Sequence, residues 1–171
     1  MISQRRLARE RVLQTLYAYE ISGTSPEFLS TDIMKDITDQ AALDFAKKLF
    51  RDTLENIKDL DCILQNHLEH WDMTRVNPID RSLLRMGIAE ILFSQEIPTK
   101  VTMNEIIELA KRYSTEESPK FVNGILDASL KQLLGEGRIK KSGRGLIETS
   151  SKSTNPSPRG GTPSGPAGRN P

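Results

Sequence analysis

Between positions 43 and 67, one stripe of apolar residues limits the possible folds of this chain more than any other pattern in it. Its members recur at alternating steps of three and four residues: Leu43, Ala46, Phe50, Thr53, Ile57, Leu60, Leu64 and His67. That spacing keeps one face of an α-helix apolar, whereas a half-buried strand needs a period of two. The stripe therefore predicts a single long amphipathic helix of roughly 40 Å, packed along another helix.

Helix signals also cover most of the remaining chain up to residue 134. Ser25-Pro26, Asn77-Pro78 and Ser118-Pro119 each place a capping residue before a proline, which is typical of a helix start. Sustained alternation and Asn-Gly hairpin signals are missing, so strands are not expected. The sequence predicts an all-α protein with further helices over 3–22, from 26, over 79–94, over 102–113 and over 118–134.

The segment 79–94 is apolar on most sides, and we expect it to lie at the centre of the fold. Gly87 in its middle lowers helix stability, so its presence predicts a close approach by another part of the chain. Thr102 and Glu105 have the spacing of a capping box, which predicts that the next helix begins at Thr102.

The chain changes character at Gly135. Residues 135–171 hold eight glycines, five prolines and no Phe, Tyr or Trp. Such a segment buries too little apolar surface to offset the entropy of an ordered chain. We therefore divide the chain into a helical domain over 1–134 and a disordered basic tail rich in Gly, Pro and Ser over 135–171.

Charge is distributed unevenly behind a formal net charge of +1. Residues 1–12 carry four arginines and one glutamate, for a net +3. Residues 135–171 carry seven basic and two acidic residues, a net +5, while 13–134 carry thirteen basic and twenty acidic residues, a net −7. An acidic body with two basic ends favours a polyanion bound from the ends.

Several functional classes are disfavoured by the sequence. No apolar run approaches the length of a membrane span, and the first residues do not resemble a secretory signal. Cys62 is the single cysteine, so an intrachain disulfide is excluded and a reducing cytoplasm is expected. The glycines before the tail are isolated, and Cys62, His67 and His70 lack an obvious fourth metal ligand. We expect no catalysis, no cofactor and no metal.

The N-terminal arginines are the strongest candidates for a binding role. Arg5 and Arg9 are one turn apart and continue the line of Leu13, so we expect them to project from the body beside Arg6. Guanidinium groups suit phosphates and stack on bases. Tyr17 lies roughly on the same side of the helix as Arg6; it is either a core residue or a stacking platform, and the sequence leaves both open.

Four segments of the chain resemble the NusB family of bacterial transcription antitermination factors. They are RRLARERVLQTLYAYE at 5–20, IDRSLLRMGIAEIL at 79–92, IPTKVTMNEIIELAKRY at 97–113 and ESPKFVNGILD at 117–127. They occur in the family's order and spacing and together cover roughly residues 4–134.

The resemblance implies a fold of two small helical bundles packed together, and a protein without catalytic activity in the bacterial cytoplasm. It implies binding to boxA, a short single-stranded RNA element in the leader transcripts of ribosomal RNA operons. The partner for that binding is NusE, a small-subunit ribosomal protein. The assembly also contains NusA, NusG and RNA polymerase, and it helps the polymerase pass terminators.

The resemblance also assigns residues to these roles. The RNA-binding residues that it implies are Arg5, Arg6, Arg9, Tyr17, Lys120 and Phe121. For the surface that faces NusE it suggests Asp80 first and Glu117 second, both expected to be exposed near helix starts. A favourable interaction with the helix dipole explains each of these two carboxylates equally well.

Two other functions stay open at this point. A NusB-like domain also forms the N-terminal part of some ribosomal RNA cytosine methyltransferases, but residues 135–171 cannot supply the strand-rich catalytic domain. A helical scaffold that binds only protein is the other alternative, and it predicts no salt-dependent RNA binding.

Overall fold

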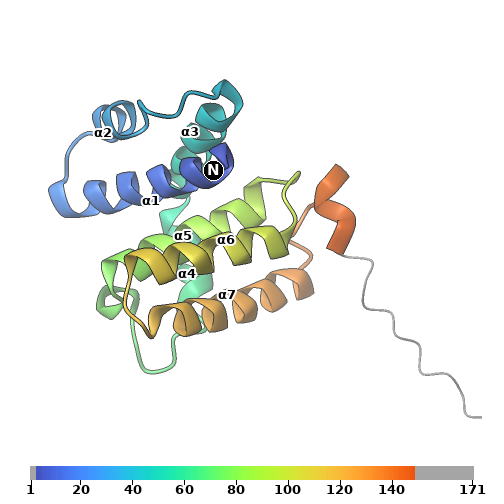
Figure 1. Ribbon diagram of the computed structural model, residues 1–171. Coiled ribbons are helices and arrows are strands. Elements are labelled where there is room, and N and C mark those ends of the chain that lie inside the picture. Colours follow the sequence, from blue (N-terminus) through green and yellow to red (C-terminus); the bar gives the residue numbers. More distant parts are fainter. Residues whose placement is uncertain (1–2, 149–171) are drawn as a thin grey trace, which may run out of the picture.

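The computed structural model describes residues 3–148, and all regular secondary structure within them is helical (Figure 1). The α-helices are α1 (Gln4–Ser22), α2 (Pro26–Ile33), α3 (Gln40–Glu55), α4 (Ile57–Gln65), α5 (Pro78–Phe93), α6 (Thr99–Tyr113) and α7 (Ser118–Gly135), and the 3-10 helices are η1 (Met73–Arg75) and η2 (Gly143–Glu148). No strand occurs in this part of the chain, which confirms the all-α prediction. None of the described helices is both long enough and apolar enough to cross a membrane.

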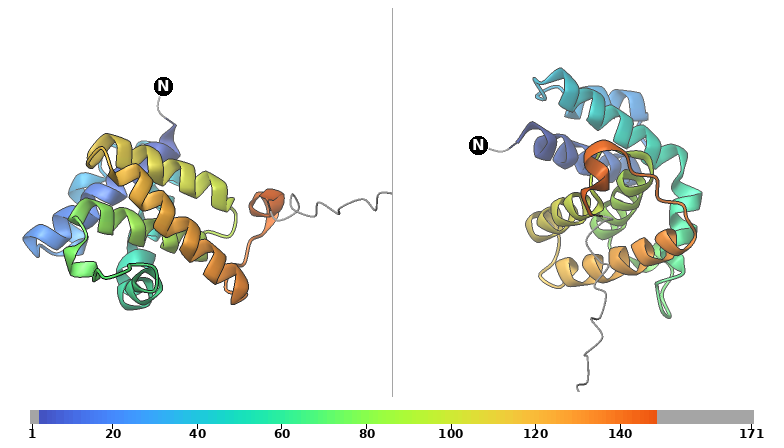
Figure 2. Two further views of the ribbon diagram at one scale, coloured as in Figure 1. Left: turned by 90° about the horizontal axis from the view of Figure 1, so that it is seen from below. Right: turned by 90° about the vertical axis from the view of Figure 1, so that its right-hand side faces the viewer.

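The helices form two bundles, with α1–α3 in one and α4–α7 in the other (Figures 1 and 2). Helix α5 lies between them and contacts α1, α3, α4, α6 and α7. Its side chains are buried on nearly every side, as the continuous apolar pattern predicted. Both the two-bundle fold and the central position of this helix are thereby confirmed.

Gly87 in α5 shows why that helix can be central. A methyl group added there would lie 3.1 Å from Leu126 Cδ2 and 3.3 Å from Ile106 Cγ1. The missing side chain thus lets α6 and α7 pack directly against the α5 backbone, which is the close approach that the sequence predicted.

The long helix predicted over 43–67 is in fact two helices, α3 and α4, separated at Asn56. The Asn56 side chain donates from Nδ2 to the Asp52 carbonyl at 2.8 Å, which competes with continuation of the helical ladder. The apolar stripe is nevertheless largely buried on both sides of the break, with Phe50 and Leu60 in the core. The period of the stripe therefore predicted the buried face correctly, whereas it did not predict the break between α3 and α4.

The capping box predicted at Thr102 is also wrong. Helix α6 begins three residues earlier, at Thr99, and no side chain caps its first turn. The Thr102 hydroxyl is fully buried and donates instead to Glu90 Oε1 at 2.7 Å. The Thr102 hydroxyl therefore bonds to Glu90 on another helix, and not to the backbone of its own helix as the local pattern predicted.

Residues 136–148, which the sequence analysis placed in the tail, dock on the connection between α5 and α6. Lys141 Nζ donates to the Ser94 carbonyl at 2.9 Å, and the Ser142 amide donates to the Gln95 carbonyl at 3.0 Å. A methyl group at Gly145 would lie 2.1 Å from the same Gln95 oxygen, so only glycine allows this packing. The rest of the predicted tail, 149–171, lies outside the described residues.

Candidate nucleic-acid interface

The first turn of α1 presents two exposed arginines beside α6. The Ser3 hydroxyl accepts from the Arg6 amide and so caps the helix. The Arg6 guanidinium donates from Nε and Nη2 to the two carboxylate oxygens of Glu105, at 2.9 and 2.7 Å. These hydrogen bonds, reinforced by the opposite charge, raise the pKa of Arg6 and lower that of Glu105. Arg6 is therefore held in place, yet its side chain stays 46% exposed.

Arg5 is exposed to a similar degree and is held more loosely. Its guanidinium carbon lies 4.6 Å from the centre of the Phe45 ring on α3, which is a cation–π arrangement. Its only charged contact in the described chain is at 3.7 Å, between Nη1 and Glu96 Oε1, and both side chains are about half exposed. Such a contact adds little stability, so Arg5 can exchange it for a phosphate oxygen at small cost.

Arg9 does not project from the body, contrary to the prediction. It is 3% exposed, and its Nε and Nη2 donate to the carboxylate of Glu90 on α5 at 2.8 and 2.7 Å. Glu90 is fully buried and accepts a third bond from Thr102. A buried arginine needs such a partner, and a lone glutamate inside the apolar helix α5 was the sequence signal for it. Arg9 thus fixes α1 to α5 and α6, and is not in a position to touch RNA directly.

A second set of contacts ties α1 to α6 at Glu10. This carboxylate is 5% exposed; it accepts from Arg112 Nη1 at 2.9 Å and makes a short hydrogen bond with the Tyr113 hydroxyl. Burial, followed by the hydrogen bond to Glu10, raises the pKa of Tyr113. These contacts join α1 to α6 one turn beyond Arg6, and so hold the helix that carries Arg5 and Arg6.

Tyr17 lies further along the same helix and is 40% exposed. Of the two possibilities that the sequence left open, burial in the core is therefore excluded. Eleven residues separate Tyr17 from Arg6, which corresponds to about 16 Å along the helix axis. That spacing allows contact with different nucleotides of one extended strand.

Lys120 and Phe121 lie in the first turn of α7, and both are exposed. Phe121 forms one wall of a groove of about 460 Å³, and Trp71, from the loop between α4 and α5, lines the same groove. Trp71 was not among the binding residues predicted from the sequence. A lone tryptophan in a polar loop was the signal that could have identified it.

The two carboxylates predicted to face a protein partner differ in their surroundings. Asp80 is buried, not exposed; it accepts from Ser114 Oγ at 2.6 Å and from Ser118 Oγ at 2.8 Å. It therefore joins the start of α5 to the connection between α6 and α7. Glu117 is exposed and its side chain makes no capping bond at the start of α7. Of the pair, Glu117 alone has a carboxylate available for a partner.

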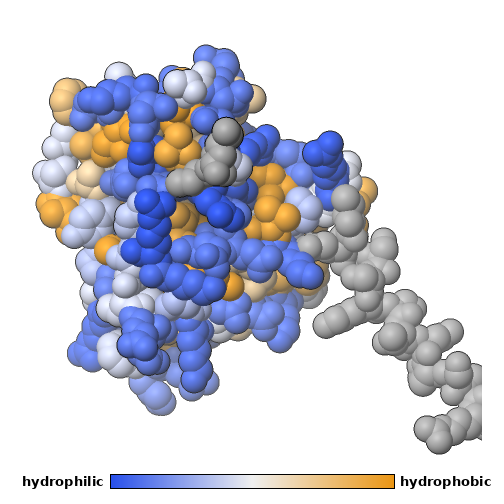
Figure 3. Space-filling view, viewed as in Figure 1, coloured by the Kyte–Doolittle hydropathy of each residue, from blue (hydrophilic) through white to orange (hydrophobic). Residues whose placement is uncertain are grey.

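Taken together, the exposed residues suit a single-stranded polyanion. The face in Figure 3 is mainly hydrophilic over α1 and α6. Guanidinium groups at the start of α1 provide donors for phosphates, and Tyr17 and Phe121 provide exposed rings for stacking. Donors for phosphates and exposed rings for stacking are the groups that a binding surface for RNA needs.

Comparison with protein families gives a match over most of the chain. The model of the NusB family matches residues 6–131. The transcription antitermination protein NusB of Salinibacter ruber is 46% identical over 85% of this chain and 92% of its own length. The protein of the same name from Chloroherpeton thalassium is 42% identical over 89% of this chain and 73% of its own length.

Solved structures with this fold agree. T. maritima NusB is 38% identical and superposes with a TM-score of 0.72, covering 77% of this chain and 94% of its own. A chain from the crystal structure of antitermination factors NusB and NusE in complex with dsRNA is 31% identical, with a TM-score of 0.71, and covers 77% of this chain and 99% of its own.

Proposed function

The chain belongs to the NusB family, and on that basis we propose that it is a transcription antitermination factor that binds boxA RNA together with NusE. In this role it holds the leader transcript of a ribosomal RNA operon in the bacterial cytoplasm. NusA, NusG and RNA polymerase complete the assembly, which lets the polymerase read through terminators. The chain itself contributes binding and no catalytic step.

The observation that carries the proposal is the pair of exposed arginines, Arg5 and Arg6, on a first helical turn that buried contacts keep fixed. Each has a side chain about half exposed, whereas Arg9 beneath them is buried against Glu90. Rigid donors lose little conformational entropy when a phosphate binds. A 31% identical chain comes from the solved complex of NusB and NusE with dsRNA, which supports RNA as the ligand and NusE as the partner, without bearing on whether the RNA is single-stranded.

Further contacts follow from the exposed residues already described. Tyr17, Lys120 and Phe121 extend the proposed RNA surface from α1 to the start of α7. Glu117, at that same helix start, is the residue we propose for contact with NusE. Asp80 acts through the fold, because its carboxylate holds Ser114 and Ser118 and thereby positions the turn that carries Glu117.

A titration with labelled RNA tests this function. A boxA-like oligonucleotide and a scrambled control are titrated by fluorescence anisotropy, with and without NusE, at two salt concentrations. We expect boxA to bind more tightly than the scrambled RNA, and NusE to strengthen the preference. Equal, salt-independent or undetectable binding of both RNAs in the presence of NusE would exclude the function.

Matched variants locate the contacts. Arg5→Ala with Arg6→Ala should weaken the binding of both RNAs. It should also reduce the slope of log affinity against log salt concentration by roughly 0.7 for each lost phosphate contact. Lys35→Ala with Lys131→Ala removes the same charge from exposed positions elsewhere and should leave binding unchanged. If both double variants behaved alike, the effect would reflect net charge, and α1 would not be the site.

A further inference from the structure

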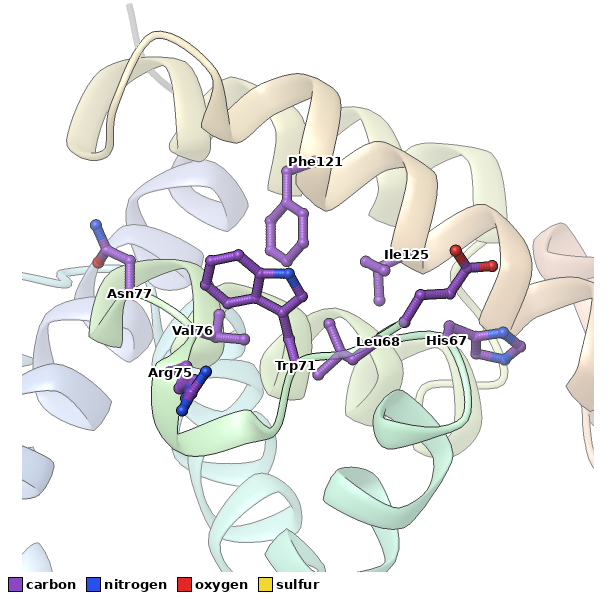
Figure 4. Close-up of a pocket in the computed structure, with 9 residues that line it drawn as sticks. His67, Leu68, Trp71, Arg75, Val76, Asn77, Phe121 and Ile125 are labelled. Carbon is purple, nitrogen blue, oxygen red and sulfur yellow. The ribbon is translucent and has the colours of Figure 1, made fainter.

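The groove between α7 and the loop joining α4 to α5 exposes two large aromatic rings. Trp71 is 59% exposed and Phe121 is 37% exposed, although both are large apolar side chains. Figure 4 shows the indole of Trp71 and the ring of Phe121 approaching each other from the loop and from α7. Leu68, Val76 and Ile125 line the groove beneath them. The result is an open slot with aromatic walls and an apolar floor.

Trp71 is exposed on a segment that is firmly held. Gln65 donates from Nε2 to the Trp71 carbonyl at 2.7 Å and accepts from the Met73 amide at 3.2 Å. Arg81 Nη1 donates to the Met73 and Val76 carbonyls at 2.6 and 3.0 Å. Two side chains thus anchor the backbone from Trp71 to Val76, so the segment that carries the indole is held by the fold.

The backbone just before Trp71 is strained. His70 has a φ of 60°, and it is the one non-glycine residue with positive φ in the described chain. That conformation costs free energy for a residue with a side chain, and it persists only where the surroundings enforce it. His70 lies directly before Trp71, so this turn of the backbone lies at the groove.

Charges at the rim favour an anionic ligand. Arg75 lines the groove and Lys120 precedes Phe121, and both are exposed. Neither forms an ion pair with another residue of the described part of the chain. Glu69 is the opposing charge on the lining, and His67 is engaged through Nε2 with Gln132 Oε1 at 2.8 Å. Flat aromatic walls, with Arg75 on the lining and Lys120 next to Phe121 along the chain, match a nucleobase with its neighbouring phosphates.

We propose that Trp71 and Phe121 form a slot for one unstacked base of the bound RNA, with Arg75 and Lys120 contacting the adjacent phosphates. This inference rests on the proposed function, and it adds Trp71 and Arg75 to the RNA-binding surface. A protein partner that inserted an apolar side chain would use the floor of the groove but would gain nothing from the two cations. The charge pattern therefore favours RNA over a peptide.

Trp71 itself reports on the slot, because it is the single tryptophan of the chain. Its fluorescence should be quenched as boxA-like RNA is added, with the same midpoint as the anisotropy of the labelled RNA. A series of oligonucleotides, each with one abasic nucleotide, should contain one position whose change weakens binding and removes most of the quenching. That position identifies the base in the slot.

Variants test the contribution to affinity. Trp71→Ala should raise the Kd by about 5- to 100-fold with little change in salt slope, and Trp71→Phe should recover most of the loss. Arg75→Ala should instead reduce the slope by roughly 0.7. Phe28→Ala is the matched control, since it removes another ring that is 65% exposed, on α2, and should change neither. Melting curves recorded for each variant verify that the fold is retained.

The outcomes separate this inference from the proposed function. If the unaltered protein with NusE binds no RNA, the proposed function fails. If it binds boxA normally while Trp71 fluorescence stays constant and Trp71→Ala binds as tightly as the parent, the slot is overturned and the function stands. If Trp71→Ala weakens binding of NusE without RNA and spares RNA binding, the groove belongs to a protein partner, which also overturns the inference.

Discussion

Replacing Arg9 with alanine should destabilise the protein and should not act as the loss of a phosphate contact. Arg9 is 3% exposed and bridges α1 to the fully buried Glu90 on α5. Its neighbours Arg5 and Arg6 are exposed on the same turn of helix. One short segment thus offers a direct comparison between an arginine that holds the fold and two that are proposed to hold RNA.

The magnitude follows from what the substitution leaves behind. Glu90 would lose two hydrogen bonds and its ion-pair partner, and would keep the hydrogen bond from the Thr102 hydroxyl. Removing one partner of a buried ion pair costs about 3–5 kcal/mol. That is a large part of the 5–15 kcal/mol that separates a typical native domain from its unfolded state. At about 3 °C per kcal/mol for a domain of this size, the Tm should fall by roughly 10–15 °C.

Urea denaturation and calorimetry measure the loss, and a second variant tests its cause. If the cost arises from an uncompensated carboxylate, then Arg9→Met combined with Glu90→Leu should recover most of the stability, because apolar pairs replace buried ion pairs with little penalty. The free energy of unfolding of Arg5→Ala with Arg6→Ala should lie within about 1 kcal/mol of that of the parent. RNA affinity is measured below the melting range of every variant.

Two outcomes would contradict the role assigned to Arg9. A melting temperature for Arg9→Ala close to that of the parent, accompanied by weaker RNA binding and a shallower salt slope, would place Arg9 in contact with RNA. A double variant as unstable as Arg9→Ala would show that packing, and not the unpaired charge, caused the loss.

Three further predictions concern stability. Gly87→Val should cost about 1–3 kcal/mol by urea denaturation, because its side chain would overlap α6 and α7. Truncation after Leu134 should cost about 1–3 kcal/mol relative to truncation after position 148, since it removes the docked residues 136–148 and two hydrogen bonds to the α5–α6 connection. Arg6 lowers the pKa of Glu105 below its usual 4.5. Their pair therefore stabilises the fold above that pH, and this contribution is lost as the pH falls through the lowered pKa. In Arg6→Gln, NMR titration should show the pKa of Glu105 returning toward its usual value.

Much of the helical framework follows from local patterns. Ser3, Ser25 and Asn77 cap helices where the sequence predicted helix starts, because capping depends on residues within one turn. The continuous apolar surface of 79–94 likewise predicted the central helix, and Gly87 its close neighbours. These features need no knowledge of which distant segment lies opposite.

The fate of individual polar groups depended on distant segments. Thr102 bonded to Glu90 on α5, where a cap on its own helix was predicted. The sequence around Asp80 predicted an exposed helix start, but the fold buries Asp80 beside Ser114 and Ser118, which donate hydrogen bonds to its carboxylate. In each case the local pattern was present, and a partner elsewhere in the chain offered a better hydrogen bond.

The binding surface shows the same division. The sequence by itself placed a basic cluster at the start of α1 and helices throughout residues 3–135, since charge and hydrophobic period are properties of neighbouring residues. Only the tertiary structure decided that Arg9 is buried while Arg5 and Arg6 are exposed, and that Trp71 lines one groove with Phe121. Burial of the Arg9 charge depends on a partner, and that partner is the carboxylate of Glu90, 81 positions away. The sequence therefore determined which chemical groups the protein has, and folding determined which of them a ligand can reach.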